Sequence, residues 1–281
     1  MNKNILVLQS DFGLVDGAVA AMCGVAHEVD KDLKIYNLTH DITPYHIWEA
    51  SYRLFQTVEY WPKGTVFVSV VDPGVGSSRK SVVALTKNGH YIVTPDNGTL
   101  THLKRYVGIT EIREIDETRH RRQNTEHSFT FHGRDIYSHT GAKLAAGTIE
   151  FKDVGNLLSV ENIQELEIGT VTKTENSVKG SIDILDVRFG SLWTNVTRED
   201  FLEQGFDYGD RIEVIIRNGS TLVYNNRLIY GKSFADVYVS EQIIYVNSLD
   251  RMAVAINQGN FARAYSIGTG IHWSIEFKKI D

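Results

Sequence analysis

The chain has 281 residues, 42% of them hydrophobic, and a formal net charge of −6 at pH 7. This is enough apolar material for one large domain or two modest ones. Scattered Lys and Arg residues and an acidic balance give no basic footprint for nucleic acid and argue against binding to an anionic membrane surface, so a neutral or cationic small ligand fits better.

A single cysteine, Cys23, excludes an internal disulfide framework and a thiolate metal cage. No apolar run reaches the ~18 residues that a membrane helix needs. The first residues lead into a strand-like run at residues 5–8 and do not resemble a secretory signal. We therefore expect a cytoplasmic protein with no membrane or nucleic-acid partner.

The first half alternates β-branched apolar runs with helical patterns, which is typical of βα units around a mostly parallel sheet. Helices are predicted over residues 16–29 and 47–60, and a third from about His132 to Gly147. Asn88 and Gly89 separate two strands as a tight hairpin does. The strands are predicted over residues 5–9, 34–38, 65–71, 81–86 and 91–94.

After about Gly147 the long helical patterns stop and strand-like segments recur, which indicates an all-β module. Polar turns are expected at residues 175–176, 218–219 and 225–226. We therefore predict an α/β domain over residues 1–158 and a β domain over residues 168–281. The sequence contains no internal repeat or low-complexity tract.

Four polar clusters accompany the predicted elements of the first domain. They are S-D-F-G from Ser10 with Asp16, V-D-P-G-V-G followed by Arg79, T-P-D-N-G from Thr94, and F-H-G-R-D from Phe131. The first three follow strands directly, and the fourth opens a helix. Because ligands of open α/β sheets bind outside the carboxyl ends of the strands, these clusters are expected to converge there.

Asp72, Arg79 and His132 combine an acid, a fixed cation and a group that exchanges a proton near neutral pH. Pro73, with glycines on its loop, allows Asp72 and Arg79 to curl back toward one another. The set suits activation of a water molecule, with Asp72 orienting an imidazole or a water. The alternative is an ion pair that ties down the loop, with His132 capping its helix.

Asp11 and Asp16 form a carboxylate pair able to accept hydrogen bonds from the vicinal hydroxyls of a sugar. The alternative for Asp16 is helix capping, which needs no function. In the second domain, the segment around Trp193 places aromatic rings beside amide and carboxylate groups, as a site for a flat heterocycle does. A buried core tryptophan is the other interpretation.

The same residues raise two other possible functions. Residues 74–81 fit the G-x-x-x-x-G-K-S phosphate loop except at Arg79, and a strand rather than a helix follows, so we reject a nucleotide triphosphatase. A hydrolytic metal site on Asp11, Asp72, Asp96 and His132 lacks H-x-H or H-E-x-x-H spacing, and Arg79 disfavours a dication. No metal is expected.

These motifs, together with H-D-I-T-P from His40 and T-P-D-N-G-T-L, resemble the S-adenosyl-L-methionine (SAM) hydroxide adenosyltransferases, which are relatives of the fluorinase and chlorinase. The resemblance spans nearly the whole chain in order. It implies an N-terminal α/β domain, a C-terminal barrel-like β domain, and a homotrimer that holds SAM between subunits. It also implies that water or hydroxide attacks C5′ of the ribose and releases adenosine and methionine, with SAM as substrate and no cofactor.

By motif position, the resemblance assigns water activation to Asp72, Arg79 and His132. The halogenating relatives lack the pairing of Asp72 with His132, so its presence favours hydrolysis over halogenation. The resemblance assigns substrate binding to Asp11, Asp16, Tyr45, Gly133, Asp186, Phe189, Ser191, Trp193 and Ser248. Ser191 replaces the usual Asn of F-G-N, and Asp250 replaces the Gly of N-S-x-G. The alternative functions are a non-catalytic SAM or adenosine sensor and a metal-dependent hydrolase.

Overall fold

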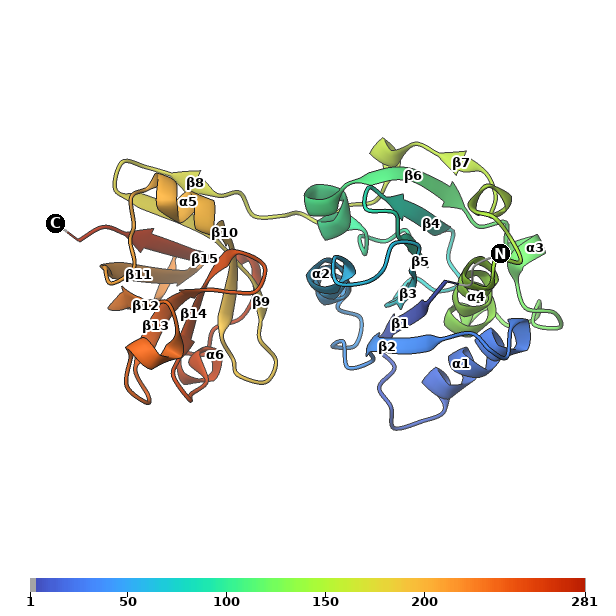
Figure 1. Ribbon diagram of the computed structural model, residues 1–281, viewed down its shortest axis with the longest axis horizontal. Helices are drawn as coiled ribbons and strands as arrows, with labels where there is room; N and C mark the ends of the chain where they lie inside the picture. Colours follow the sequence, from blue (N-terminus) through green and yellow to red (C-terminus); the bar gives the residue numbers. More distant parts are fainter. Residues whose placement is uncertain (1–3, 281) are drawn as a thin grey trace. The chain divides into compact units, whose positions relative to one another are not determined.

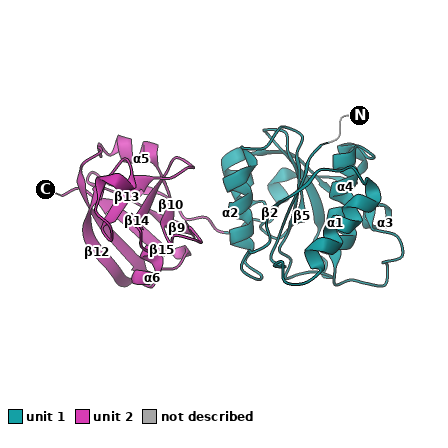
Figure 2. Ribbon diagram, turned by 60° about the horizontal axis from the view of Figure 1, so that its bottom comes forward, with its two compact units in different colours: residues 1–166 teal, residues 167–281 magenta. Residues whose placement is uncertain are grey.

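The computed structural model describes residues 4–280. The chain divides into two compact units, Met1–Leu166 and Glu167–Asp281 (Figures 1 and 2). Each unit has its own apolar core. No helix in the described part of the chain is both long and apolar enough to cross a membrane.

Unit 1 is built on a seven-stranded sheet with the order β2-β1-β3-β5-β4-β6-β7. The strands are β1 (Leu6–Ser10), β2 (Ile35–Thr39), β3 (Val66–Val70), β4 (Ser81–Thr86), β5 (Tyr91–Pro95), β6 (Ile109–Glu114) and β7 (Leu157–Leu158). The β2-β1-β3-β5 neighbours are parallel, whereas β4, β6 and β7 pair antiparallel. Because β1, β3 and β5 are parallel, their carboxyl ends meet at one edge of the sheet.

Helices cover both faces of this sheet (Figure 1). Met22 and Ala26 of α1 pack with Leu144 of α4 on the central strands, and α2 lies on the opposite face with Ala50 against Val71. The α-helices are α1 (Ala18–Val29), α2 (Ile47–Val58), α3 (Glu117–His120) and α4 (His139–Ala146). Shorter turns are η1 (Leu103–Val107), η2 (Gly133–Ser138), η3 (Phe151–Asp153) and η4 (Val160–Asn162).

Unit 2 is a closed β-barrel of seven strands, since β10 pairs with both β14 and β9. The strands are β9 (Ser177–Leu185), β10 (Leu192–Thr197), β11 (Arg211–Asn218), β12 (Thr221–Tyr230), β13 (Gln242–Val246), β14 (Arg251–Ile256) and β15 (Gly270–Lys278), with β8 (Thr172–Lys173) added beside β9. Helical segments are α5 (Arg198–Glu203), α6 (Phe261–Ala264) and η5 (Phe234–Asp236). Phe201, Phe206 and Phe277 fill part of the core.

The predicted class, an α/β domain followed by an all-β barrel-like domain, is confirmed. One turn prediction was wrong: Asn225 and Asn226 lie inside β12, not between strands. They continue the ladder opposite Ile215 and Val214 of β11. Both side chains are exposed, so the strand accommodates two turn-favouring residues without burying an unpaired amide.

Candidate functional site

The loop after β3 folds back on itself, as its sequence predicts. Pro73 and the following residues turn, with the Ser77 amide donating to the Gly74 carbonyl at 3.0 Å. The Arg79 guanidinium then meets Asp72 with two hydrogen bonds, of which Nε to Oδ1 is 2.8 Å. Both side chains are nearly buried, with 10% and 5% of their surfaces exposed. A buried bidentate pair of this kind fixes the guanidinium plane firmly.

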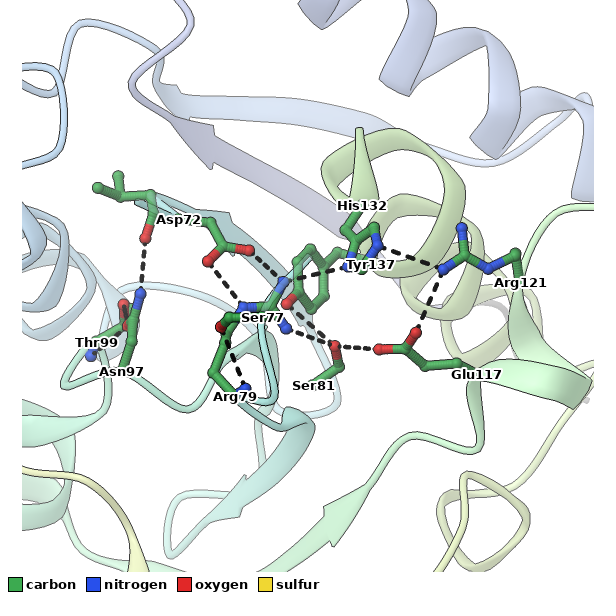
Figure 3. A network of polar contacts seen from close by, with 11 residues as sticks. Asp72, Ser77, Arg79, Ser81, Asn97, Thr99, Glu117, Arg121, His132 and Tyr137 are labelled. Carbon is green, nitrogen blue, oxygen red and sulfur yellow. Dashed lines mark hydrogen bonds and ion pairs between the residues drawn. The ribbon is translucent and has the colours of Figure 1, made fainter. Parts of the chain in front are cut away.

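The side-chain amide of Asn97 holds this loop at the sheet edge. The Asn97 amide, from the T-P-D-N-G cluster after β5, donates to the Val71 carbonyl at 2.9 Å. Asn97 Oδ1 in turn accepts from Thr99 at 2.8 Å. A hydrogen bond therefore joins the ends of β3 and β5 beside Asp72 (Figure 3).

His132 completes the predicted set. It lies at the start of the π-helical turn η2, is 5% exposed, and its Nδ1 lies 3.2 Å from Arg79 Nη2. The contacts run in the order Asp72, Arg79, His132, so Asp72 orients the guanidinium in the ion pair that the alternative interpretation expected, and its bonds go to Arg79 instead of the imidazole. The His132 side chain makes no capping bond, which contradicts the capping alternative.

The same cluster extends beyond the predicted residues (Figure 3). Arg79 Nη1 donates to Ser81 at 3.0 Å, and the Ser81 hydroxyl donates to Glu117 Oε1 at 2.8 Å. Arg121 Nη2 lies 3.3 Å from both Glu117 Oε2 and His132 Nε2. The buried Tyr137 hydroxyl lies 3.1 Å from Ser81.

Burial is the first cause of a lowered pKa at His132, so the neutral imidazole is favoured. Glu117 and Asp72 oppose this shift, whereas Arg79 and Arg121 add to it. For Arg79, burial is the largest single influence and acts to lower the pKa, but the hydrogen bonds to Asp72 and the nearby acidic groups together outweigh it, so the pKa is raised. The site therefore holds a permanent cation beside a neutral base near pH 7.

Asp11 and Tyr45 are brought together at the end of β1. Asp11 Oδ2 accepts from the Tyr45 amide at 2.8 Å and so holds Tyr45 at a positive φ of 68°, with 73% of its surface exposed. Such a conformation is strained for a residue with a side chain. Asp16 instead accepts from the Ala18 amide at 2.9 Å at the start of α1, which agrees with the helix-capping alternative.

Gly133 and Asp96 both make their contacts within unit 1. A Cβ on Gly133 would lie 3.1 Å from Val70 and 3.2 Å from Phe12, so glycine permits η2 to pack closely on β3. Asp96 accepts from the Gln164 amide at 3.0 Å. Among residues 4–280, no three His, Cys, Asp or Glu side chains gather as a metal-binding group.

Unit 2 carries a cavity of about 870 Å³ on the barrel. Phe189 and Phe234, which are 69% and 41% exposed, contribute two aromatic walls, and the Phe234 ring lies 5.1 Å from that of Tyr245. The lining residues are Asp186, Arg188, Phe189, Ser191, Phe234, Tyr245, Ile256, Asn257, Gln258, Gly259 and Asn260. A flat heterocycle with polar edges suits this mixture of rings and amides.

Three of the five residues predicted in unit 2 line this cavity: Asp186, Phe189 and Ser191. Trp193 is 8% exposed and reaches the cavity wall only through its hydrogen bond of 3.3 Å to the Tyr245 hydroxyl. Ser248 is exposed after β13 and does not line the cavity. Burial raises the pKa of Tyr245, with hydrogen bonds to Ser191 and Trp193 opposing the shift.

Sequence reasoning missed Glu117 and Arg121, because residues 116–127 are strongly polar and lack an apolar period that would place them. It also missed Phe234 and Asn260, which reach the cavity only once the barrel closes. Tyr245 had a weak signal, since it lies in a segment predicted to be a strand with a polar end.

An acid, guanidinium and imidazole cluster on an α/β sheet, followed by a barrel with an aromatic-walled cavity, defines a two-domain protein equipped to act on a small molecule. The chain matches the SAM hydroxide adenosyltransferase N-terminal domain over residues 6–155 and the C-terminal domain of the same family over residues 180–274. The chain belongs to the SAM hydroxide adenosyltransferase family.

Individual relatives agree with this assignment. The chain is 36% identical to an (R)-S-adenosyl-L-methionine hydrolase of Methanocaldococcus jannaschii over 219 residues, which cover 76% of this chain and 74% of that protein. It is 26% identical to a fluorinase of Actinopolyspora mzabensis, with 96% of each chain covered. The crystal structure of an uncharacterized conserved protein from Thermotoga maritima matches with a TM-score of 0.88 and 32% identity, covering 98% of this chain and 100% of that one.

Proposed function

We propose that this protein is an enzyme that hydrolyses SAM to adenosine and L-methionine by attack of water or hydroxide on C5′ of the ribose. The observation that carries the proposal is Arg79, which joins Asp72 to His132 in one buried chain of contacts. Membership in the family and the (R)-S-adenosyl-L-methionine hydrolases among the relatives support the same substrate and reaction.

The reaction balances without a cofactor. A bond forms between the water oxygen and C5′, the bond from C5′ to sulfur breaks, and its electron pair neutralises the sulfonium. One proton is released from the water. Because the sulfonium is already a good leaving group, the protein needs only to position and partly desolvate the nucleophile.

Each member of the Asp72, Arg79 and His132 set has a distinct role in this proposal. The Arg79 guanidinium donates to the attacking oxygen and stabilises its negative charge. His132, favoured as the neutral imidazole, accepts the proton that the water loses. Asp72 holds the plane of Arg79 through its two hydrogen bonds.

The remaining predicted residues bind substrate. Asp11 and Tyr45, together at the end of β1, are suited to the ribose, and Asp16 lies a few residues further along the same loop. Gly133 allows the close packing that places His132. The unit 2 residues Asp186, Phe189 and Ser191 meet the adenine and methionine ends, with Trp193 acting through Tyr245; a role for Ser248 stays a prediction.

The decisive experiment is incubation of the purified protein with SAM in ¹⁸O-labelled water, followed by mass spectrometry of the products. Adenosine labelled at its 5′-oxygen and unlabelled methionine are expected. Recovery of intact SAM that has bound to the protein would favour the sensor instead. Loss of activity after treatment with a chelator, restored by a divalent metal, would favour the metal-dependent hydrolase.

A homotrimer with SAM between subunits is part of the proposal, as the family resemblance implies. Light scattering coupled to size exclusion is expected to give a mass three times the 31.7 kDa of the chain. A monomer that hydrolyses SAM at full rate would contradict the interface site while leaving the reaction intact. The cytoplasmic location expected from the sequence stays a prediction.

A further inference from the structure

His132 lies inside a closed circuit of polar contacts. Starting from Arg79, the contacts pass to Ser81, Glu117, Arg121 and His132, and return to Arg79 (Figure 3). Two of the members, Glu117 and Arg121, belong to α3 and its C-terminal end, and Arg121 is the one that contacts His132. This circuit surrounds the imidazole with two arginine–carboxylate pairs.

The two pairs are arranged alike. Arg79 Nη2 contacts Asp72 and lies 3.2 Å from His132 Nδ1, and Arg121 Nη2 contacts Glu117 and lies 3.3 Å from His132 Nε2. In each arginine the same Nη2 nitrogen thus faces both a carboxylate oxygen and a ring nitrogen. Since an Nη2 group has two hydrogens, it is able to serve both.

This arrangement has a direct consequence for the protonation of the ring. A guanidinium only donates, so a ring nitrogen that faces it is satisfied only when that nitrogen carries a lone pair. An imidazolium has N–H groups at both positions, and both would point at a cation. The neutral ring keeps one lone pair and avoids a third positive charge between Arg79 and Arg121.

We propose that Glu117 and Arg121 form a positioning pair for His132, in which Arg121 keeps the imidazole neutral and oriented toward Arg79 and Glu117 holds Arg121 against the ring. The inference rests on the proposed role of His132 as the proton acceptor. Neither Glu117 nor Arg121 is assigned to the reacting atoms. Their effect on the reaction is exerted through the ring.

The charges that face His132 come from every element around it: Asp72 and Arg79 from the loop after β3, Glu117 and Arg121 from α3 and its end, and Tyr137 from η2. Glu117 favours the imidazolium and Arg121 disfavours it. Tyr137 is uncharged near pH 7, because burial raises its pKa. The two members of the pair therefore act on the ring in opposite directions.

A purely structural role for Arg121 is the competing explanation. Its Nη1 donates to the Ser128 carbonyl at 3.1 Å, and its guanidinium lies 5.7 Å from the Phe129 ring centre, so it also ties residues 122–131 to α3. Loss of that tether would lower stability or activity without moving the titration of His132 in a defined direction. The sign of the shift separates the two explanations.

The test uses the full chain labelled with ¹³C-histidine, with the His132 signal assigned by its absence in His132→Gln. In Arg121→Gln the NMR titration midpoint of His132 is expected to rise by about one pH unit or more, because a nearby cation is lost. In Glu117→Gln the midpoint is expected to fall. The direction follows from the loss of a nearby anion that favours the imidazolium.

Arg122→Gln is the matched control. Arg122 is the next residue along the chain and carries the same charge, but it pairs with Glu28 at 2.7 Å on the surface and makes no contact with His132. In Arg122→Gln the titration midpoint of His132 is expected to stay at the wild-type value. Arg121→Lys, which keeps the charge but not the planar fork, is expected to recover most of the shift seen in Arg121→Gln.

Opposite shifts in the two variants, with the control unmoved, support the positioning pair. Shifts of the same sign in Arg121→Gln and Glu117→Gln, or no shift in either, overturn it. The pH profile of SAM hydrolysis then tests the proposed function separately. If the NMR midpoints move and the acid limb of kcat/KM does not follow, the positioning pair stands and the catalytic role of His132 fails.

Discussion

His132 links the geometry of the site to its pH dependence. Burial and two neighbouring guanidinium groups lower the pKa of its imidazole below the ordinary value of 6.5. Only the neutral ring is able to accept a proton from water. The active form is therefore complete at neutral pH and is lost as the pH falls below 6.5 through the lowered pKa.

This sign gives the first residue-scale prediction. The rate constant kcat/KM for SAM is expected to be flat from about pH 7 to 8 and to fall on the acid side with a slope of one proton. In His132→Gln the rate should drop by roughly 10²–10⁴-fold and the acid limb should disappear. The affinity of His132→Gln for adenosine, measured by calorimetry, should remain near the wild-type value. If the acid limb persists in His132→Gln, it belongs to another titrating group.

Asp72→Asn tests the anchoring of Arg79. The amide cannot provide the two carboxylate oxygens that hold Arg79 Nε and Nη2, so the guanidinium loses its fixed plane. Removing one partner of this nearly buried pair should lower the free energy of unfolding by about 3 kcal/mol, measured by urea denaturation. Hydrolysis should slow by roughly 10²-fold or more.

The matched control for Asp72→Asn is Glu28→Gln, which breaks a surface ion pair with Arg122. This change should cost less than about 1 kcal/mol and leave turnover unchanged. Equal losses in the two variants would mean that the buried position of Asp72 has no special importance.

At the scale of elements, the loop between β9 and β10 shapes the cavity of unit 2. Gly190 in this loop has a φ of 65°, and a Cβ there would lie 2.0 Å from the Asn260 side chain. Asn260 is not free to move away, because its side chain accepts from the Arg263 amide at 2.7 Å and caps α6. The loop and α6 therefore fit together only with glycine at this position.

Gly190→Ala is accordingly expected to displace the loop that carries Phe189 and Ser191. Adenosine affinity, measured by calorimetry, should fall by about tenfold or more, the effect of losing roughly 1.4 kcal/mol of contacts. Gly219→Ala is the control, because Gly219 has a similar φ of 57° but no atom within 4 Å of its added Cβ. In Gly219→Ala, backbone strain should lower the free energy of unfolding by about 1 kcal/mol, and the affinity for adenosine should not change. Equal affinities in both variants would contradict a ligand site at this cavity.

Elements were predictable where the local pattern and the tertiary environment agree. The strands that lead to Asp11 and Asp72 are short, apolar and buried, and their polar ends were identified from the sequence alone. The turn prediction at Asn225 and Asn226 was wrong because pairing with β11 outweighs their preference for turns. Asn218 and Gly219 do connect β11 to β12, and there Gly219 adopts the positive φ of 57° that a tight turn favours.

The site was only partly predictable for a related reason. Asp72, Arg79 and His132 follow recognisable strand ends and motifs, so their convergence could be expected. Glu117 and Arg121 belong to a polar segment whose position depends on how α3 packs beside η2. A contact such as Arg121 to His132 has no local signature, since both partners are common surface residues.

At the scale of the whole molecule, the two units differ in their buried titratable groups. Unit 1 holds five histidines whose pKa values burial lowers: His40, His90, His120, His132 and His139. Unit 2 holds a buried carboxyl, Asp183, whose pKa burial raises to about 6. Acidification is therefore expected to act on the two units in opposite directions.

The sign follows from proton linkage. A histidine with a lowered folded-state pKa contributes stability that is complete above its unfolded value of 6.5 and is lost as the pH falls, because the unfolded chain binds the proton more readily. Asp183 behaves oppositely, since below about pH 6 the folded state takes up a proton and the cost of burying its charge is relieved. Asp96, whose pKa burial raises, opposes the trend in unit 1 as one group against five.

Differential scanning calorimetry between about pH 7.5 and 5.5 tests this prediction. The transition of unit 1 should move down by about 5 °C or more, while that of unit 2 holds or rises slightly. Gly219→Ala identifies the unit 2 transition, because Gly219 lies between strands of the barrel. A parallel decline of both transitions would contradict the prediction, since it would place the acid sensitivity outside the buried histidines of unit 1.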